Sequence, residues 1–342
     1  AAIALGALVL RPGFTAVSVV PLAAGVTTWM VVLALLSDRA AAAYAEPGTH
    51  EGAEPADGSP SRRSFLVLAG ATAVVSLAGV AGAQLLGRGR RAVETSRRLL
   101  RLPAGRGVVP AGAELALPGL SPWRVPNEEF YRIDTALVVP AVDPSDWRLR
   151  IHGMVDQELV ITYADLLERE RTEAWVTLCC VSNEVGGDLI GNAWWSGVRV
   201  ADVLAEAGVR TEADAVLQTS HDGWTCGTPI EALTDDRNAL LAIAMNGEPL
   251  PVEHGFPVRL VVPGLYGYVS ATKWVVDLKV SRFEDFTAYW TGKGWAAKGP
   301  VKTQSRIDVP RDGADVPAGP VECQMSSRRI TVDMSPSTRR IM

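Results

Sequence analysis

The sequence predicts an α+β domain preceded by transmembrane helices. Two long uncharged runs in the first quarter of the chain indicate the helices. The domain is indicated by short runs rich in β-branched and aromatic residues, separated by turn signals and by a few short helices. Strands and helices do not alternate regularly, and neither GxGxxG nor a phosphate loop occurs, so a Rossmann enzyme or a nucleotide hydrolase has little support.

Composition sets the outer limits of the interpretation. The 342 residues are 48% hydrophobic, and the mean hydropathy is positive, which allows one substantial core and a membrane region besides. The formal net charge is -5, and no basic stripe interleaved with aromatic residues is present. Nucleic acid is therefore not an expected partner.

Residues 1–36 are expected to form a transmembrane region. The run 14–36 carries no charge and is long enough, as a helix, to cross about 30 Å of hydrocarbon. The chain opens inside another apolar run without an initiator Met, so we expect this region to be a fragment of a longer one. Residues 37–63 are rich in Ala, Gly, Pro and acidic residues and are expected to form a disordered cytoplasmic linker.

The run 64–87 is expected to be a transmembrane helix or the anchor of an export signal. Arg62 and Arg63, followed by Phe65-Leu66 and the apolar run, resemble the twin-arginine signal that exports folded proteins. Alternatively, the two arginines anchor the helix end by the positive-inside rule. Both interpretations predict an inner or plasma membrane protein with an extracytoplasmic catalytic domain, although the arginines between 88 and 101 favour the opposite orientation.

The soluble domain is expected at residues 103–308. Its helices are expected at 163–169 and at 200–207, the second with Gly208 as its C-cap. The runs that read as strands are 136–139, 147–153, 159–162, 175–178, 258–262 and 274–280.

Adjacent cysteines mark the end of the fourth of these strands. Cys179 and Cys180 precede a glycine-rich turn, and the chain has only four cysteines and no CxxC pair. This favours a single thiolate ligand for a cofactor-borne metal over a structural zinc site. Two alternatives remain open: both cysteines are small buried hydrophobes, or Cys180 is the nucleophile of a thiol enzyme, which would need a nearby base but no metal.

Seven blocks in the same order then carry a family resemblance. They lie at 147–153, 178–183, 195–198, 245–251, 254–259, 262–267 and 272–274. Together they resemble the molybdopterin domain of the sulfite oxidase family, of a membrane-anchored bacterial type, over residues 127–306. The resemblance implies a sulfite-oxidase-type molybdopterin domain, a Mo-molybdopterin cofactor and oxygen-atom transfer at a molybdenum centre.

The resemblance also implies roles for individual residues. Cys180 would be the molybdenum ligand, because it stands at the family's spacing from Asn183. His254 and Arg259 would reach the pterin and its phosphate. The remaining residues expected to bind the cofactor are Arg132, Asp134, Asn183, Asp222, Gly264, Gly267, Ser270, Thr272 and Lys273. Asp134 and Ile133 stand where the family has His and Asn, which weakens the expected pterin contacts there.

Substrate choice is less well defined. Sulfite-oxidising members carry an arginine two positions after the Asn, where this chain has Val185. Arg132 and Trp195 are expected to contribute to the substrate pocket and to catalysis. A neutral or larger oxygen-atom donor or acceptor, such as a sulfoxide, therefore fits as well as sulfite. The chain shows no haem-binding domain or iron-sulfur cysteine set, so a separate electron carrier is expected, either a cytochrome or a quinone-linked partner.

The C-terminal segment departs from the family. Residues 301–307 and 310–313 resemble the start of the immunoglobulin-like dimerisation domain, but 309–342 is too short for a sandwich and ends in an atypical tail. A truncated domain is expected here, without the family's homodimer contacts. A last alternative is a membrane-anchored binding module that keeps the fold and has lost the cofactor.

Overall fold

The computed structural model describes residues 89–103, 105–114, 122–309 and 324–328, together with Gly25 and Trp29. The chain divides into two units, 1–91 and 92–342, and the second holds nearly all of these residues. The expected membrane spans and the linker at 37–63 lie outside the described residues, apart from Gly25 and Trp29. None of the helices in the described ranges combines the length and the apolar character needed to cross a membrane.

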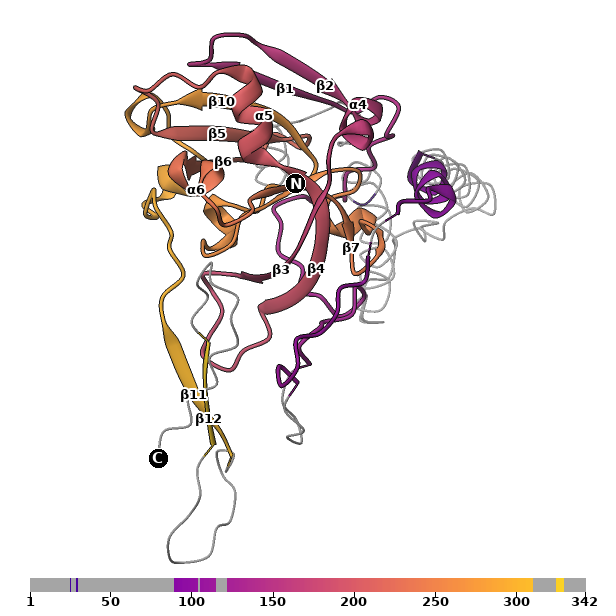
Figure 1. Ribbon diagram of the computed structural model, residues 1–342, viewed down its shortest axis with the longest axis vertical. Helices are drawn as coiled ribbons and strands as arrows, with labels where there is room; N and C mark the ends of the chain where they lie inside the picture. The colour runs from indigo at the N-terminus through magenta and orange to yellow at the C-terminus, as the bar shows by residue number, and fades with distance from the viewer. Residues whose placement is uncertain are drawn as a thin grey trace, which may run out of the picture. The chain divides into compact units, whose positions relative to one another are not determined.

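Two sheets form the framework of the second unit (Figure 1). The first is mixed, with β1 parallel to β10 and its other neighbours antiparallel, in the order β2 (Leu159–Thr162), β1 (Arg148–Gly153), β10 (Val275–Ser281), β5 (Ala215–Ser220) and β6 (Thr225–Pro229). The second is antiparallel and contains β3 (Thr172–Cys179), β4 (Ile190–Arg199), β7 (Leu240–Met245) and β8 (Glu248–Pro249), with β9 (Arg259–Val261) also paired to β7.

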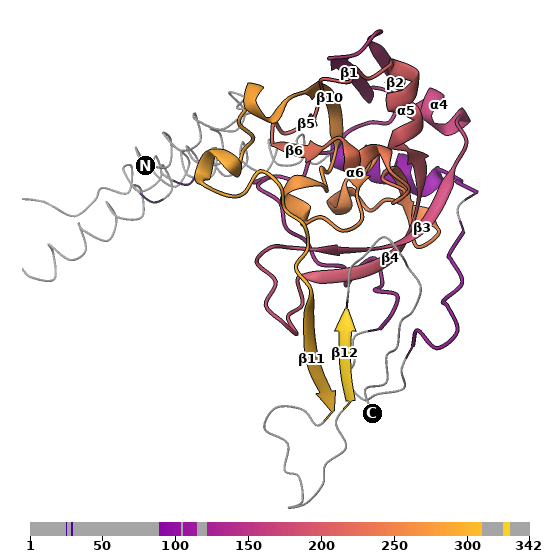
Figure 2. The same cartoon turned by 60° about the vertical axis from the view of Figure 1, so that its left-hand side comes forward.

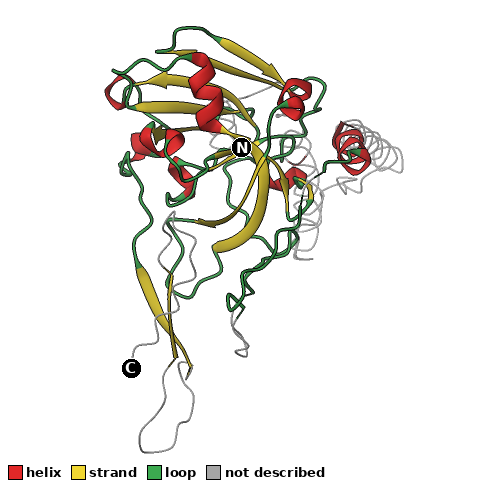
Figure 3. Ribbon diagram, viewed as in Figure 1, coloured by secondary structure: helices red, strands yellow, loops and turns green. Residues whose placement is uncertain are grey.

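Helices between the strands are short, as Figure 3 shows. Residues 89–99 are helical, and the others are α4 (Tyr163–Glu168), α5 (Val200–Ala207), α6 (Glu231–Thr234) and the 3-10 turns η2 (Val252–His254), η3 (Gly267–Val269), η4 (Phe283–Asp285) and η5 (Thr291–Lys293). This α+β arrangement, without regular alternation, confirms the predicted class.

The elements that lie closest to their predicted residues also show the expected local features. In β1, Leu149 and Ile151 are buried while Arg150 between them is exposed, as period-2 alternation requires. Helix α5 buries one apolar face and ends at Gly208, whose φ of +69° is readily available to glycine. A reciprocal capping box between Thr162 and Asp165 starts α4.

The second sheet positions the adjacent cysteines. Every residue of β7 is buried, and this strand lies in the middle of the sheet. β4 pairs with β7, and β3 pairs with β4 on the far side; Figure 2 shows β3 and β4 side by side. The buried apolar side chains of both sheets form one continuous cluster. Since β3 ends at Cys179, Cys180 is the first residue of the following turn.

One predicted strand is wrong. Residues 136–139 form no strand, and Leu137 and Val138 are 68% and 79% exposed. No strand in the described ranges pairs with them, and Pro140 follows at once, so their β-branched and apolar residues form no strand.

The C-terminal part is described only in one hairpin. β11 (Gln304–Val309) pairs antiparallel with β12 (Gln324–Arg328). Residues 310–323 and 329–342 lie outside the described ranges, so the expected truncated immunoglobulin-like region stays a prediction.

Candidate active site

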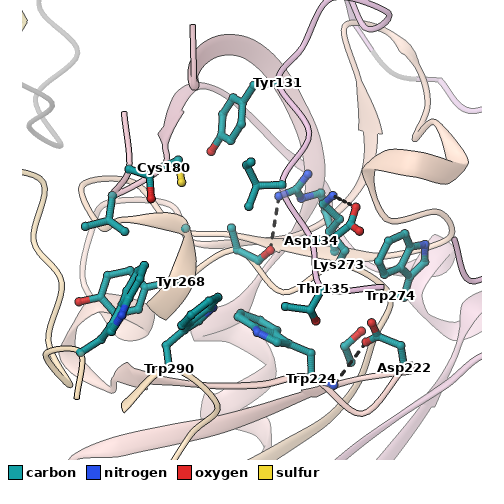
Figure 4. A pocket seen from close by; sticks show the side chains of 18 of the residues that line it. Tyr131, Asp134, Thr135, Cys180, Asp222, Trp224, Tyr268, Lys273, Trp274 and Trp290 are labelled. Carbon is teal, nitrogen blue, oxygen red and sulfur yellow. Dashed lines mark hydrogen bonds and ion pairs between the residues drawn. The ribbon is translucent and has the colours of Figure 1, made fainter. Parts of the chain in front are cut away.

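A cavity of about 290 Å³ lies beside Cys180 (Figure 4). Its walls come from six segments that are distant in sequence: 130–135, 180–182, 220–224, Arg259, 267–274 and 290–295. The predicted site residues that line it are Asp134, Cys180, Asp222, Arg259, Gly267 and Lys273.

The turn after β3 holds Cys180 at the cavity. The backbone N–H of Cys180 donates to the carbonyl of Leu189 at 2.9 Å, and the Cys180 carbonyl accepts from Asn183 N–H at 3.0 Å. The Asn183 side chain accepts from Leu189 N–H at 2.8 Å. Asn183 is thus placed to close the turn rather than to line the cavity, although the sequence predicted cofactor contact.

The neighbouring thiol faces elsewhere. Cys179 is buried at 2% exposure and its Sγ lies 3.4 Å from the Cys180 carbonyl. Burial, with a smaller contribution from Cys180, raises the pKa of Cys179 to about 11. Cys179 therefore carries its proton at neutral pH, and of the two thiols only Cys180 lines the cavity.

Arg259 is a buried cation with no carboxylate partner among the described residues. It is 3% exposed, and its guanidinium donates to the carbonyls of His254 at 3.1 Å and Ala271 at 3.5 Å. The guanidinium lies over the ring of Trp195, 5.1 Å from its centroid. Burial lowers the pKa of Arg259 to about 10, which shows how poorly this charge is compensated.

Trp195 does not line the cavity, contrary to its predicted place in the substrate pocket. Its side chain is fully buried, and its indole N–H donates to the carbonyl of Val176 at 3.1 Å. Its ring instead packs against the guanidinium of Arg259.

His254, whose carbonyl accepts from Arg259, has one ring nitrogen that is free to accept a hydrogen bond. Nε2 is 3.1 Å from the carbonyl of Asn127, and since a carbonyl only accepts, Nε2 carries the proton. Nδ1 is then an acceptor, and it is buried without a hydrogen-bond partner. Burial, assisted by Arg259 and Lys273, lowers the pKa of His254 to about 4.

This depressed pKa predicts acid sensitivity of the cofactor-free protein. Below the ordinary pKa of about 6.5 the unfolded chain takes up a proton at His254 that the folded chain refuses. The contribution of His254 to the free energy of unfolding is at its maximum above pH 6.5. It decreases by about 3 kcal/mol as the pH drops towards 4. Denaturant unfolding between pH 7 and pH 4 measures it. In His254→Gln the fall should be correspondingly shallower, and parallel curves for the two proteins would contradict this assignment.

A charge network occupies the wall opposite Cys180. Lys273 Nζ lies 3.0 Å from the carboxylate of Asp134, which also accepts from Arg132 Nε at 2.8 Å. Burial raises the pKa of Asp134, but these two cations outweigh it and hold the pKa below its ordinary value. Burial, with Arg259 nearby, lowers the pKa of Lys273 to about 8. Arg132 is 42% exposed in its side chain and does not line the cavity, although a catalytic role was predicted for it.

Only some of the expected cofactor-binding residues between 264 and 273 face the cavity. Gly267 and Lys273 line it, whereas Gly264 forms a turn at φ +82° and Ser270 Oγ donates to the carbonyl of Tyr266 at 2.9 Å. The hydroxyl of Thr272 donates to Gln218 Oε1 at 2.5 Å. Ser270 and Thr272 therefore hold the loop from inside.

A buried amide anchors this loop at two points. Gln218 on β5 accepts from Thr272 and donates through Nε2 to the hydroxyl of Thr228 on β6 at 2.5 Å. That hydroxyl donates to the carbonyl of Val269. All three side chains are fully buried, so one amide fixes the loop to two strands of the first sheet.

The sequence analysis missed four aromatic residues of the cavity, here called the aromatic wall: Trp224, Tyr268, Trp290 and Trp295. Trp290 and Trp295 flank η5, so their spacing of five residues brings their rings together. The density of aromatic residues at 289–295, in a stretch without a strand pattern, was the available signal.

Comparison with known proteins identifies the domain. Residues 136–290 match the family described as "Oxidoreductase molybdopterin binding domain". The chain is 35% identical over 157 residues to an uncharacterized oxidoreductase of Bacillus subtilis, YuiH, matching 46% of this chain and 76% of that protein. It is 34% identical over 237 residues to human mitochondrial sulfite oxidase, matching 57% of this chain and 43% of that protein.

Among solved structures, the sulfane dehydrogenase SoxCD from Paracoccus pantotrophus matches with a TM-score of 0.48 at 28% identity, over 60% of each chain. The chain spans less than half the length of the mammalian sulfite oxidases that it matches.

The groups around the cavity fit an anionic, metal-bearing pterin. Arg259 is a buried cation without a carboxylate, and its planar guanidinium suits a phosphate. His254 Nδ1 and Ser220 Oγ are buried polar atoms without partners, and pterin heteroatoms can supply such partners. Cys180 adds one soft sulfur ligand at the same cavity. The chain therefore belongs to the molybdopterin-binding oxidoreductases related to sulfite oxidase, and its cofactor is Mo-molybdopterin.

Proposed function

We propose that this protein catalyses oxygen-atom transfer between water and a small molecule, with Cys180 as the protein's ligand to molybdenum. One observation carries the proposal: among the described residues, one thiol faces the cavity, and the same cavity holds a buried arginine that has no carboxylate partner there. A soft thiolate and a phosphate-binding cation are the two groups that a metal-bearing pterin requires.

Each residue then has a defined task. The Cys180 thiolate would hold the metal, Arg259 the cofactor's phosphate, and His254 would accept a hydrogen bond from the pterin through Nδ1. The cofactor supplies the two-electron redox chemistry, and the protein supplies position and electrostatic environment. The turn closed by Asn183 keeps Cys180 facing the cavity, and the Gln218 network keeps Gly267 and Lys273 in place.

Electrons would pass to or from a separate carrier, either a cytochrome or a quinone-linked partner. Sulfite and neutral sulfoxides are the candidate substrates, and the direction of turnover follows from which of them is used. The incomplete set of cations favours a neutral substrate, since Val185 is exposed and Arg132 is committed to Asp134.

The thiol-enzyme alternative has weaker support. A thiol nucleophile needs a base beside it, and no histidine lines the part of the cavity that the structure describes. The buried imidazole of His254 does not line the cavity, and its Nε2 donates to the Asn127 carbonyl. A binding module without cofactor would leave Arg259 permanently uncompensated, at a cost of several kcal/mol.

Turnover of the purified holoenzyme tests the proposal. With an artificial one-electron dye and a panel of sulfite, thioethers and sulfoxides, at least one substrate should be converted. In the oxidative direction, water labelled with ¹⁸O should place the label in the product. Molybdenum-loaded protein that converts no member of the panel would reject oxygen-atom transfer.

We further propose that a twin-arginine signal exports the folded domain across the cytoplasmic membrane. Replacing Arg62 and Arg63 by lysine is expected to retain the protein in the cytoplasm, because the signal needs arginines and not merely positive charge. Cell fractionation with a protease-accessibility assay measures this. The control pair Arg90→Lys and Arg91→Lys should not change the location, and normal delivery of the Arg62/Arg63 variant would exclude the signal.

A further inference from the structure

We propose that the aromatic wall is the specificity determinant of this site, and that it selects a neutral substrate carrying a flat, apolar group next to the atom that gives or takes oxygen. This inference rests on the proposed function and names its substrate class. None of the four wall residues was assigned a role from the sequence.

The wall is built as a unit. Trp290 and Trp295 stack with ring centroids 4.4 Å apart at 27°, and Tyr268 meets the edge of Trp295 at 5.0 Å. Backbone contacts hold these rings in place: Trp295 N–H donates to the Trp290 carbonyl at 3.2 Å, and the Tyr268 hydroxyl donates to Ala296 at 2.9 Å. Trp224 reaches the same cavity from the turn between β5 and β6. A prearranged wall of this kind loses little side-chain entropy when a ligand binds.

The wall rings are only partly covered by the protein. All four wall residues are half-buried, so part of each aromatic surface remains available at the cavity. Figure 4 shows Tyr268 and Trp290 on the side of the cavity away from Asp134 and Lys273, with Trp224 between Trp290 and Asp222. Two exposed apolar side chains, Ile133 at 52% and Val181 at 36%, also line it. Such a surface matches a flat apolar group through burial and ring stacking.

Charge argues against an anionic substrate. Two cations, Arg259 and Lys273, and two carboxylates, Asp134 and Asp222, line the described part of the cavity. Lys273 is paired with Asp134 at 3.0 Å, and Arg259 is the group expected to take the cofactor's phosphate. Asp222 has no cationic partner among the described residues and lies two residues from Trp224, to whose N–H it accepts at 3.3 Å. No uncommitted positive charge remains for the substrate, and Asp222 would repel an anion.

Conversion of a sulfoxide to its thioether is a balanced two-electron, two-proton reaction. In the reductive direction a sulfoxide takes two electrons from two equivalents of a reduced one-electron dye and two protons from solvent, its S–O bond breaks, and the oxygen leaves as water. The thioether is the other product. The oxidative direction is the reverse, with water as the oxygen source and the dye as electron acceptor.

Three matched substrates test the inference on the holoenzyme. Methyl phenyl sulfoxide carries the flat group, dimethyl sulfoxide lacks it, and 4-(methylsulfinyl)benzoate adds a negative charge; the matching thioethers serve in the oxidative direction. We expect kcat/KM for the phenyl compound to exceed that of each other substrate by on the order of tenfold. In Trp290→Leu the preference for phenyl over dimethyl should fall towards parity.

Ratios between substrates cancel differences in folding and cofactor content between variants. Trp194→Leu is the matched control, because Trp194 is half-buried on β4 against Trp175 and does not line the cavity. Trp224→Leu, from another segment, is a second variant if Trp290→Leu does not fold.

The outcomes separate the two proposals. Turnover of neutral substrates with no phenyl preference, or with a preference that survives both wall substitutions, overturns this inference and leaves oxygen-atom transfer standing. A faster reaction with the benzoate overturns it as well. Failure to convert any of the three, or sulfite, by molybdenum-loaded enzyme overturns the proposed function together with the inference.

Discussion

Replacing Cys180 by serine is expected to remove molybdenum from the protein and to abolish turnover. An alkoxide or hydroxyl oxygen is a much poorer ligand than a thiolate for a soft, sulfur-preferring metal site. Loss of an outer-shell partner of a metal ligand already costs roughly 10–100-fold, so loss of the ligand itself should cost more than about 100-fold in activity. Elemental analysis of the purified variant, together with turnover per mole of protein, measures both effects.

The adjacent cysteine provides the control for this experiment. Cys179→Ser changes the same atom type one residue away, at a thiol that is buried and does not line the cavity. It should retain close to one equivalent of molybdenum and activity within about tenfold of the unmodified enzyme, allowing for the cost of a buried hydroxyl. If the two variants exchanged these behaviours, Cys179 would be the ligand.

Replacement of Arg259 by methionine is expected to lose the cofactor while the domain still folds. Two charge-assisted hydrogen bonds to a phosphate are worth about 1.5–3 kcal/mol each, so cofactor affinity should fall by at least about 100-fold. Folding should suffer less, because removing an uncompensated buried charge offsets the loss of hydrogen bonds to the carbonyls of His254 and Ala271. The expected change in unfolding free energy of the cofactor-free protein is within about 2 kcal/mol.

Arg150→Met is a suitable control for this substitution. Arg150 lies on β1, is 51% exposed and pairs with Glu158 at 3.0 Å, so its loss should change neither cofactor content nor stability appreciably. Molybdenum content and thermal unfolding of the two variants give the comparison. An Arg259→Met protein that keeps a full equivalent of molybdenum would show that another group binds the phosphate.

The sequence was most informative where local and tertiary requirements coincide. The strand β2 and the helix α5 lie at the predicted residues, because alternation in the strand and a glycine C-cap in the helix are local signals. The family resemblance singled out Cys180 rather than Cys179 by its spacing from Asn183, and in the structure Cys180 lines the cavity while Cys179 is buried; which thiol binds the metal stays a prediction. Local signals were misleading at 136–139, because a strand needs a pairing partner and the described part of the chain offers none there.

The remaining differences concern residues whose role depends on contacts with distant segments. Thr272 and Ser270 were expected at the cofactor, but Gln218 and the Tyr266 carbonyl hold them on the inner side of the loop. Trp195 was expected at the substrate and supports Arg259. The aromatic wall joins three segments, and no periodicity in the sequence links them.

The Gln218 amide also constrains which amino-acid substitutions this protein can accept during evolution. Thr272 and Thr228 each hydrogen-bond one end of the same buried amide, so a substitution at any one of the three positions removes hydrogen bonds from the buried polar groups that stay behind. Single replacements are therefore costly, whereas a simultaneous exchange for apolar side chains of similar size is tolerated far better. Positions 218, 228 and 272 should accordingly covary among homologues as one linked set, although residue 218 itself never touches the cavity.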